Sequence, residues 1–261
     1  MGFLDGKVAL ITGAGQGVGR GIALAMAREG AAIAVAGRTQ HKIESVCAEI
    51  MSLGGHAVPI TGDVKIAADV IRIVDATVAA FGGLDILVNN AQEVPLGRLL
   101  EARIEEYQAG FDSGPIASLR FMQACYPHLK ARGGGSIVNL VTAAAVRWDM
   151  AGYGMHGSVK QAIRSLTRAA AAEWGPDNIR TNNIAPEALS PSFADWMKAD
   201  PETTAAFVKT IPLGRVGDCE QDIGRFVALL CSPGVVPQWP SRRDLTWAMV
   251  SGASRSGLSF R

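Results

Sequence analysis

A glycine-rich segment near the start of the chain constrains the fold more than any other feature. The apolar run at 8–12 leads into TGAGQGVG at 12–19, and an amphipathic stretch follows with apolar residues at 22, 23 and 26. Glycines allow positive φ in such a turn, let a pyrophosphate approach the backbone, and let the helix pack closely. The start of the helix then offers free N–H groups and a favourable dipole to phosphates. The expected contacts come from Gly13, Gln16, Gly17, Val18 and Gly19.

Glycine also occurs in tight strand–helix connections that bind nothing, so the rest of the chain must decide. Short runs rich in Val and Ile alternate with longer amphipathic stretches, which predicts a mostly parallel sheet covered by helices on both faces. The expected class is α/β, a doubly wound Rossmann fold with a seven-stranded sheet. The expected strands are residues 8–12, 32–36, 57–61, 85–89, 136–141, 179–185 and 245–250.

Length and composition favour a single dinucleotide-binding domain over residues 1–261. The chain has 261 residues, of which 48% are hydrophobic, and no repeat or linker divides it. Residues 187–210 follow the sixth strand and combine prolines with a helical pattern. An insertion there lies at the carboxyl edge of the sheet, where ligands bind, so we expect a substrate lid.

Charge and cysteine usage exclude several classes of protein. The net charge is +1 without a basic stripe, which argues against a nucleic-acid partner. No apolar run approaches the roughly 20 residues of a membrane span, and no signal-peptide core precedes the first strand. Scattered cysteines indicate reduced thiols without a disulfide framework or metal site, and we expect a cytoplasmic protein. The cysteines are Cys47, Cys125, Cys219 and Cys231.

The end of the second strand indicates which dinucleotide binds. It reads Ala36-Gly37-Arg38-Thr39, without the acid that binds the ribose hydroxyls of NAD. A guanidinium can bind a 2′-phosphate through two hydrogen bonds, so Arg38 favours NADPH. The alternative is an exposed arginine on a solvated loop.

Several motifs in order resemble the short-chain dehydrogenase/reductase family. They are TGxxxGxG at 12–19, Asp63-Val64, Asn89-Asn90-Ala91, Pro127, SIVN at 136–139, Lys160 and IRTNNIAP at 179–186, and they extend over nearly the whole chain. The resemblance implies nicotinamide binding and hydride transfer to or from a carbonyl or alcohol. It also implies a homodimer or homotetramer built on the helices around 115–132 and 155–174.

The resemblance assigns roles to single residues. Asp63 and Val64 would flank the adenine, Asn89 and Ala91 would line the cofactor cleft, and Lys160 would hydrogen-bond the nicotinamide ribose. Gln16 stands where NADPH-dependent members often carry a basic residue.

The catalytic positions depart from the family pattern, so we expect a divergent member with an atypical catalytic tetrad. The family places a tyrosine four residues before the lysine, and here that residue is His156. Thr142 lies near the expected serine, one residue further from His156 than usual, although it could equally be a strand residue with a buried methyl group. Gly114, followed by Pro115, stands where the pattern has an asparagine.

His156 and Lys160 lie one helical turn apart on the same face of the expected helix. The lysine cation disfavours a protonated imidazole, while Glu187 could oppose that effect. A neutral imidazole is a useful base and a poor acid, which favours alcohol oxidation or hydride delivery to an iminium carbon. The alternative is a helix histidine without a chemical role.

Three further features bear on the site. Tyr153 would supply a displaced phenol if the helix begins early enough, whereas the adjacent glycines equally allow a looped start. After Pro186 the family usually has glycine, so Glu187 places a carboxylate beside the expected carboxamide site of the nicotinamide. Tryptophans 148, 196 and 239 either line an apolar pocket or serve in packing, and the carboxyl end lacks the usual Asp-Gly-Gly.

The sequence therefore favours an NADPH-dependent oxidoreductase with an apolar or nitrogen-containing small-molecule substrate. Two alternatives stay open. One is a non-redox cyclase, lyase or isomerase in the same cleft, and the other is a catalytically inactive partner subunit.

Overall fold

A single parallel sheet forms the centre of the computed structural model, which describes residues 2–147 and 150–234. The described strands follow the order β3-β2-β1-β4-β5-β6. They are β1 (Val8–Thr12), β2 (Ala32–Gly37), β3 (Ala57–Thr61), β4 (Ile86–Asn89), β5 (Gly135–Leu140) and β6 (Ile179–Ile184). The doubly wound α/β fold is confirmed. The seventh expected strand, at 245–250, lies outside the described residues.

The six other expected strands are present, and their ends differ from the prediction by one residue at most. β5, for example, begins at Gly135, whose N–H donates to Asn178 O just before β6. Glycine carries no side-chain pattern, so periodicity could not include this residue in the strand.

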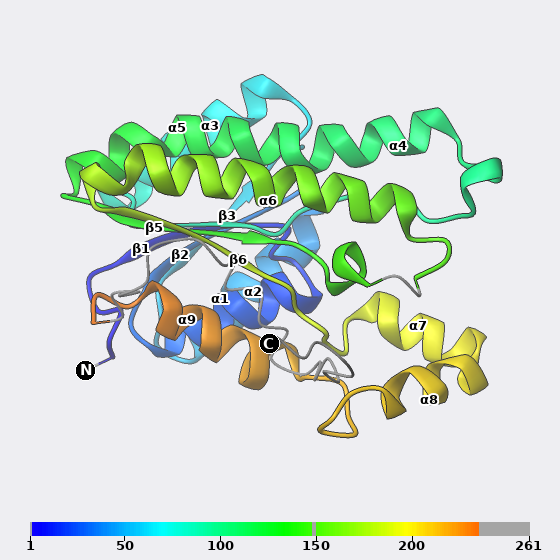
Figure 1. Cartoon of the computed structure of the whole chain (residues 1–261). Helices are drawn as coiled ribbons and strands as arrows, with labels where there is room; N and C mark the ends of the chain where they lie inside the picture. The colour runs from blue at the N-terminus through cyan, green and yellow to red at the C-terminus, as the bar shows by residue number, and fades with distance from the viewer. Residues whose placement is uncertain (1, 148–149, 235–261) are drawn as a thin grey trace, which may run out of the picture.

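Helices cover both faces of the sheet (Figure 1). One layer consists of α1 (Gly17–Arg28), α2 (Gln40–Ser52) and α9 (Arg225–Cys231). The other consists of α3 (Ala67–Phe81), α5 (Ala117–Ala131) and α6 (Gly154–Trp174), and α4 (Ile104–Phe111) leads into α5 through a π-helical turn at Asp112–Ile116. Alternate side chains of β1 point to opposite faces of the sheet and pack in two hydrophobic cores. Ala9 and Ile11 pack in one core, and Val8 and Leu10 pack in the other.

The strand order reverses at β1, which pairs with both β2 and β4. In open α/β sheets such a switch point leaves a crevice at the carboxyl ends of the strands. The turn after β1 enters that crevice with Gly13 at φ +64° and Gly17 at φ +55°, conformations that favour glycine. The predicted glycine turn therefore has the backbone that its sequence requires.

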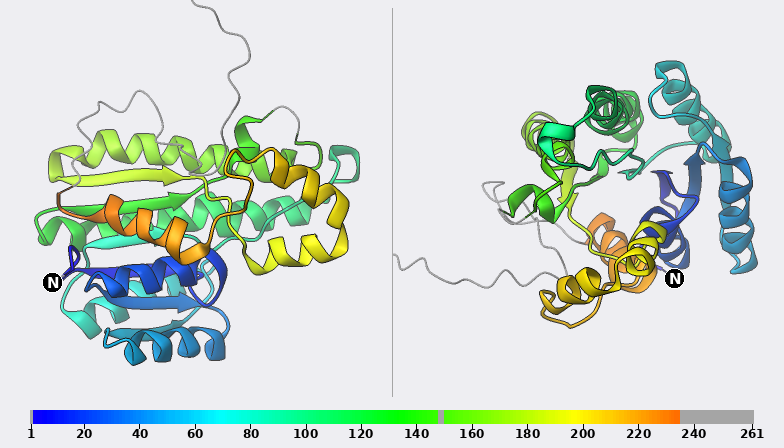
Figure 2. Two further views of the ribbon diagram at one scale, coloured as in Figure 1. Left: turned by 90° about the horizontal axis from the view of Figure 1, so that it is seen from below. Right: turned by 90° about the vertical axis from the view of Figure 1, so that its right-hand side faces the viewer.

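Two helices after β6 lie at the same end of the sheet (Figure 2). They are α7 (Pro191–Ala199) and α8 (Pro201–Lys209), within the segment expected to be a lid. Their aromatic side chains pack together, with the Trp196 ring centroid 5.4 Å from Phe193 and 5.5 Å from Phe207. Trp196 thus serves in packing between these helices. Trp148 and Trp239 lie outside the described residues.

Within residues 2–147 and 150–234, no helix combines the length and apolar character needed to cross a bilayer. The same part of the chain contains no group of three or more His, Cys, Asp or Glu side chains arranged to hold a metal ion.

Candidate active site

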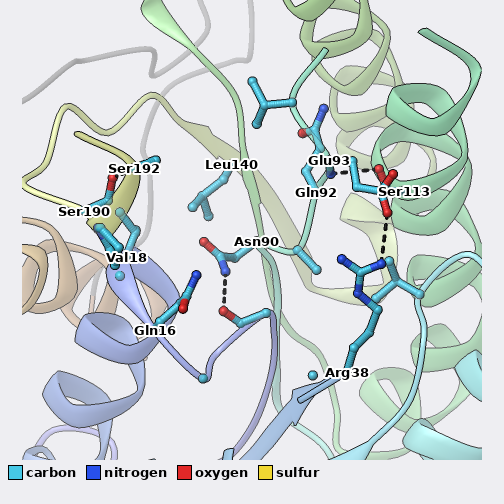
Figure 3. Close-up of a pocket in the computed structure, with 18 of the residues that line it drawn as sticks. Gln16, Val18, Arg38, Asn90, Gln92, Glu93, Ser113, Leu140, Ser190 and Ser192 are labelled. Atoms are coloured by element: carbon cyan, nitrogen blue, oxygen red, sulfur yellow. Dashed lines mark hydrogen bonds and ion pairs between the residues drawn. The ribbon is translucent and has the colours of Figure 1, made fainter. Parts of the chain in front are cut away.

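A cleft of about 480 Å³ lies at the carboxyl ends of the central strands and runs from the glycine turn to α6 (Figure 3). It gathers most of the residues that the sequence suggested. Those bordering it are Gly13, Gln16, Gly17, Val18, Arg38, Asp63, Val64, Ala91, Thr142, His156, Lys160 and Pro186. Gly19, Asn89, Tyr153 and Glu187 do not border it.

The glycine turn has the shape that a pyrophosphate needs. In the described structure no side chain caps α1 at Gln16, so its first N–H groups are available to a ligand. A Cβ on Gly13 would lie 2.8 Å from Ala91 Cα, which would force the two walls of the cleft apart. These residues fit a dinucleotide.

Gly19 lies beneath the turn rather than in the cleft. A Cβ there would stand 2.5 Å from both Asn90 Nδ2 and Gly13 O. We expect Gly19→Ala to destabilise the protein by about 1–3 kcal/mol through overpacking and to abolish dinucleotide binding. Thermal unfolding and a nicotinamide titration measure the two effects. Gly175→Ala is the matched control, since nothing lies within 4 Å of its Cβ, and equal behaviour of the two variants would contradict the prediction.

The prediction that Asn89 lines the cofactor cleft is wrong. Its side chain is buried and donates from Nδ2 to Asn139 Oδ1 at 2.8 Å. Asn90 borders the cleft instead, and its Nδ2 donates to Thr12 O at 2.9 Å and Gly13 O at 3.0 Å. Successive side chains of a strand point to opposite faces, so only one of two adjacent asparagines can reach the turn.

Arg38 extends across the cleft and meets carboxylates (Figure 3). Its Nη1 lies 3.0 Å from Glu93 Oε1 and 3.7 Å from Asp63 Oδ2. Lys65 Nζ lies 2.8 Å from the same Glu93 oxygen, and the hydrogen bond from Lys65 does most to lower the pKa of the Glu93 carboxyl. Arg38 is therefore a cleft residue, although its side chain is 58% exposed.

A second cation near the glycine turn was not identified from the sequence. Lys42, in the first turn of α2, borders the cleft and donates from Nζ to Gln16 Oε1 at 2.6 Å. Gln16 occupies the position where NADPH-dependent members of the family often carry a basic residue, and here it is hydrogen-bonded to the basic residue Lys42. Nothing in the local pattern of α2 distinguishes Lys42 from an ordinary surface lysine.

Lys160 is buried on the wall of the cleft formed by α6. It is 6% exposed, and its Nζ donates to Leu140 O at 2.6 Å. Burial lowers the pKa of the Lys160 ammonium to about 7. Burial therefore favours the neutral amine more strongly than at an exposed lysine.

His156 lies one turn before Lys160 on α6 and is 7% exposed. Burial, and after it the charge of Lys160, lowers the pKa of the imidazole to about 4. The expected direction was right, but burial is a larger cause than the lysine charge named from the sequence. Glu187 does not oppose this shift, and its charge instead helps to raise the pKa of the Tyr153 phenol. His156 is neutral at physiological pH, and its buried Nδ1 has no hydrogen-bond partner among the described residues.

Tyr153 lies outside the helix, because α6 begins at Gly154 and Tyr153 is the residue before it. Its ring centroid is 6.5 Å from that of His156, in an edge-on arrangement. The alternative in which Tyr153 shares the helical stripe of His156 and Lys160 is therefore wrong. The glycines on either side allow the looped start that the structure shows.

Two further candidates from the sequence, Thr142 and Glu187, differ in whether they border the cleft. The Thr142 hydroxyl borders the cleft and accepts the Ala144 N–H at 3.3 Å, so its own proton is available for donation. Burial raises the pKa of Glu187, and the charge of Arg147 opposes that effect. Glu187 does not border the cleft, although the preceding residue, Pro186, does.

Comparisons with known proteins identify the family of this chain. A family model described as enoyl-(acyl carrier protein) reductase matches residues 13–235. A 12α-hydroxysteroid dehydrogenase from a Clostridium species is 37% identical over 241 residues, which cover 89% of this chain and 92% of the relative. The chain belongs to the short-chain dehydrogenase/reductase family.

Solved members of the short-chain dehydrogenase/reductase family have the same fold. A 7α-hydroxysteroid dehydrogenase in complex with NADH and 7-oxo glycochenodeoxycholic acid superposes with a TM-score of 0.82 and is 31% identical, covering 88% of this chain and 89% of its own. A Beutenbergia cavernae protein solved with bound NADP at low occupancy has a TM-score of 0.82 and 29% identity, covering 89% and 92%. Family members use nicotinamide cofactors, and these two relatives hold different ones.

Proposed function

We propose that this dehydrogenase/reductase is an NADP(H)-dependent enzyme in which His156 replaces the usual tyrosine as the proton-transferring group. The observation that carries the proposal is a buried, neutral His156 one helical turn from a buried Lys160, both on the wall of the dinucleotide cleft. Perturbed pKa values of neighbouring groups in a cleft are typical of catalytic sites.

Each side chain has one task in the proposed alcohol oxidation. When bound, the dinucleotide supplies the acceptor for the hydride. Thr142 donates a hydrogen bond to the substrate oxygen, and His156 accepts the hydroxyl proton while the carbinol C–H pair leaves as hydride and the C=O bond forms. Lys160 would hold the nicotinamide ribose, and Asp63 and Val64 would flank the adenine, since all three border the cleft.

The reverse reaction is disfavoured for ordinary ketones, since a neutral imidazole does not give up a second proton in the physiological range. Reduction of an iminium carbon avoids this difficulty because it needs no proton donor. The substrates we propose are large apolar alcohols or ketones, with hydroxysteroids the first class to test because the relatives act on them, and nitrogen-containing analogues the second. Helices α7 and α8 would form the lid over such a substrate.

We also propose a homodimer or homotetramer in the cytoplasm, with α5 and α6 at the subunit contact, as the family pattern implies. The side chains of Ser165 and Arg168 on the outer face of α6 are exposed. Sedimentation analysis of the purified protein distinguishes these assemblies from a monomer.

Binding and turnover assays test the function in two steps. Titration with NADPH and NADH reports on the cleft, and absorbance of the reduced nicotinamide during incubation with hydroxysteroids reports on hydride transfer. NADPH binding with a change of absorbance is the expected result. Binding without any redox change for alcohols, ketones or imines would favour non-redox chemistry, and the absence of binding would favour an inactive partner subunit.

Arg38 determines the choice of cofactor in this proposal. Arg38→Ala should weaken NADPH binding about 10- to 100-fold, since a hydrogen-bonded charge pair contributes about 1.5–3 kcal/mol, and should leave NADH binding nearly unchanged. Glu93→Gln should tighten NADPH binding, because it releases Arg38 and Lys65 from a competing carboxylate. Arg98→Ala, at an exposed position outside the cleft lining, is the control. Equal losses for both dinucleotides would contradict the role of Arg38.

A further inference from the structure

Gln92 fills the space beside Gly114, where the family pattern has an asparagine. A Cβ on Gly114 would lie 3.1 Å from Gln92 Nε2, 3.3 Å from its Cδ and 3.0 Å from Val159 Cγ1. Gly114 is not among the residues with positive φ, so its backbone does not require glycine. The space taken by Gln92 therefore accounts for the missing side chain at 114.

The carboxamide of Gln92 is buried without a partner. Both Nε2 and Oε1 are shielded from solvent, and neither has a hydrogen-bond partner among the described residues. The nearby Ser113 hydroxyl is already engaged, since it accepts the Glu93 N–H at 2.9 Å and donates to Ala109 O at 2.7 Å. A buried amide is unfavourable unless it is hydrogen-bonded, so this group requires a partner that residues 2–147 and 150–234 do not provide.

The location of the carboxamide indicates what that partner is. Gln92 borders the same cleft as His156 and Lys160, and it contacts the Gly114 space next to Val159, the residue before Lys160 (Figure 3). The amide offers two N–H donors and one carbonyl acceptor. A hydroxyl oxygen, which both donates and accepts, satisfies such a group.

We propose that Gln92 is the carboxamide of the active site, supplied from the loop after β4 instead of from position 114 on the helix. It binds a hydroxyl oxygen, of an ordered water or of the substrate, on the α6 side of the cleft. Gln92 is a positioning residue and transfers no proton itself. The assignment deepens the proposed function and rests on it for the reaction, but not for the packing of Gln92 against Gly114.

A double-mutant cycle tests the packing without any need for turnover. Gly114→Asn should lower the Tm by several degrees in the wild-type background, because the new side chain meets Gln92. In the Gln92→Gly background the same substitution should cost less, since the contact with Gln92 is removed and only the 3.0 Å approach to Val159 Cγ1 remains. Equal losses of Tm in both backgrounds would overturn the assignment.

Steady-state kinetics test the role of the amide. Gln92→Met keeps the length of the side chain and removes its polar atoms, and it should lower kcat about 10-fold without weakening NADPH binding. The double variant Gln92→Gly with Gly114→Asn should regain most of that loss. Gln123→Met, at an exposed position of α5 outside the cleft, is the matched control.

The kinetic constants separate the two sources of the hydroxyl. If Gln92 holds a water, kcat falls and the substrate KM stays constant, whereas a substrate hydroxyl raises KM as well. Unchanged kcat and KM in Gln92→Met would overturn the proposal. Wild-type NADPH binding and turnover, measured in the same series, report separately on the proposed function.

Discussion

Replacing His156 with phenylalanine is expected to slow alcohol oxidation about 100- to 10,000-fold, the usual contribution of a general base. The acid limb of the wild-type profile that belongs to His156 should lie near the imidazole pKa of about 4, separate from any change that the titration of Lys160 near pH 7 causes. His156→Tyr should move the acid limb of the profile to higher pH, since an ordinary phenol has a pKa of about 10. Profiles of kcat/KM against pH measure both effects.

The control for these variants is His56→Gln, at an exposed position just before β3 and outside the cleft lining. It should keep the rate and the profile of the wild type. His156→Phe enzyme that oxidises alcohols at the wild-type rate would show that the imidazole has no chemical role. That result would return the histidine to the alternative of a helix residue without function.

Replacing Lys160 with methionine is expected to raise stability while it removes activity. The folded pKa of about 7 lies below the ordinary 10.5, so between these values the unfolded state binds more protons and wild-type stability rises with pH. Below pH 7 the buried ammonium costs about 3–5 kcal/mol, which methionine avoids. We expect a higher Tm at pH 6, a flatter dependence of Tm on pH, and at least about 100-fold slower turnover.

Lys198→Met is the matched control, because the Lys198 side chain is 81% exposed on α7. It should leave the dependence of Tm on pH unchanged. If the Lys160→Met protein keeps the wild-type pH slope between 7 and 10, the burial of the amino group does not set that slope.

The sequence was sufficient where a local pattern determines the structure. The glycine turn, six strands and the positions of His156 and Lys160 on one face of a helix all follow from spacing within short segments. The site residues that were missed depend on contacts between distant segments. Lys42 reaches Gln16 from another helix, and Gln92 packs beside Gly114 from the loop after β4. No local pattern marks either contact.

The errors have the same origin. Asn89 and Asn90 are identical in type and adjacent. Asn89, the last residue of β4, points to Asn139, whereas Asn90, the residue after it, points to the glycine turn. Arg38 stays the predicted ligand of a 2′-phosphate, but its ion pair with Glu93, from a loop 55 residues further along the chain, could not be predicted from the local sequence. Tyr153 was judged by helical spacing that applies only after α6 has begun, at the next residue. Ion-pair partners, side-chain directions and helix ends depend on the folded structure as a whole.

The hydrogen bond between Asn89 and Asn139 belongs to a buried chain of polar contacts that continues to α6. Asn139 Nδ2 donates to Thr167 Oγ1 at 2.8 Å, and the Thr167 hydroxyl donates to Asn183 Oδ1 at 2.7 Å. These hydrogen bonds connect strands β4, β5 and β6 to α6, the helix that carries His156 and Lys160. Helices α7 and α8 instead pack around their own aromatic cluster, and the start of α7 borders the cleft through Ser190, Pro191 and Ser192. If residues 187–210 form the proposed lid, exchanging them for those of a relative should change the substrate range while the side chains on α6 keep their positions.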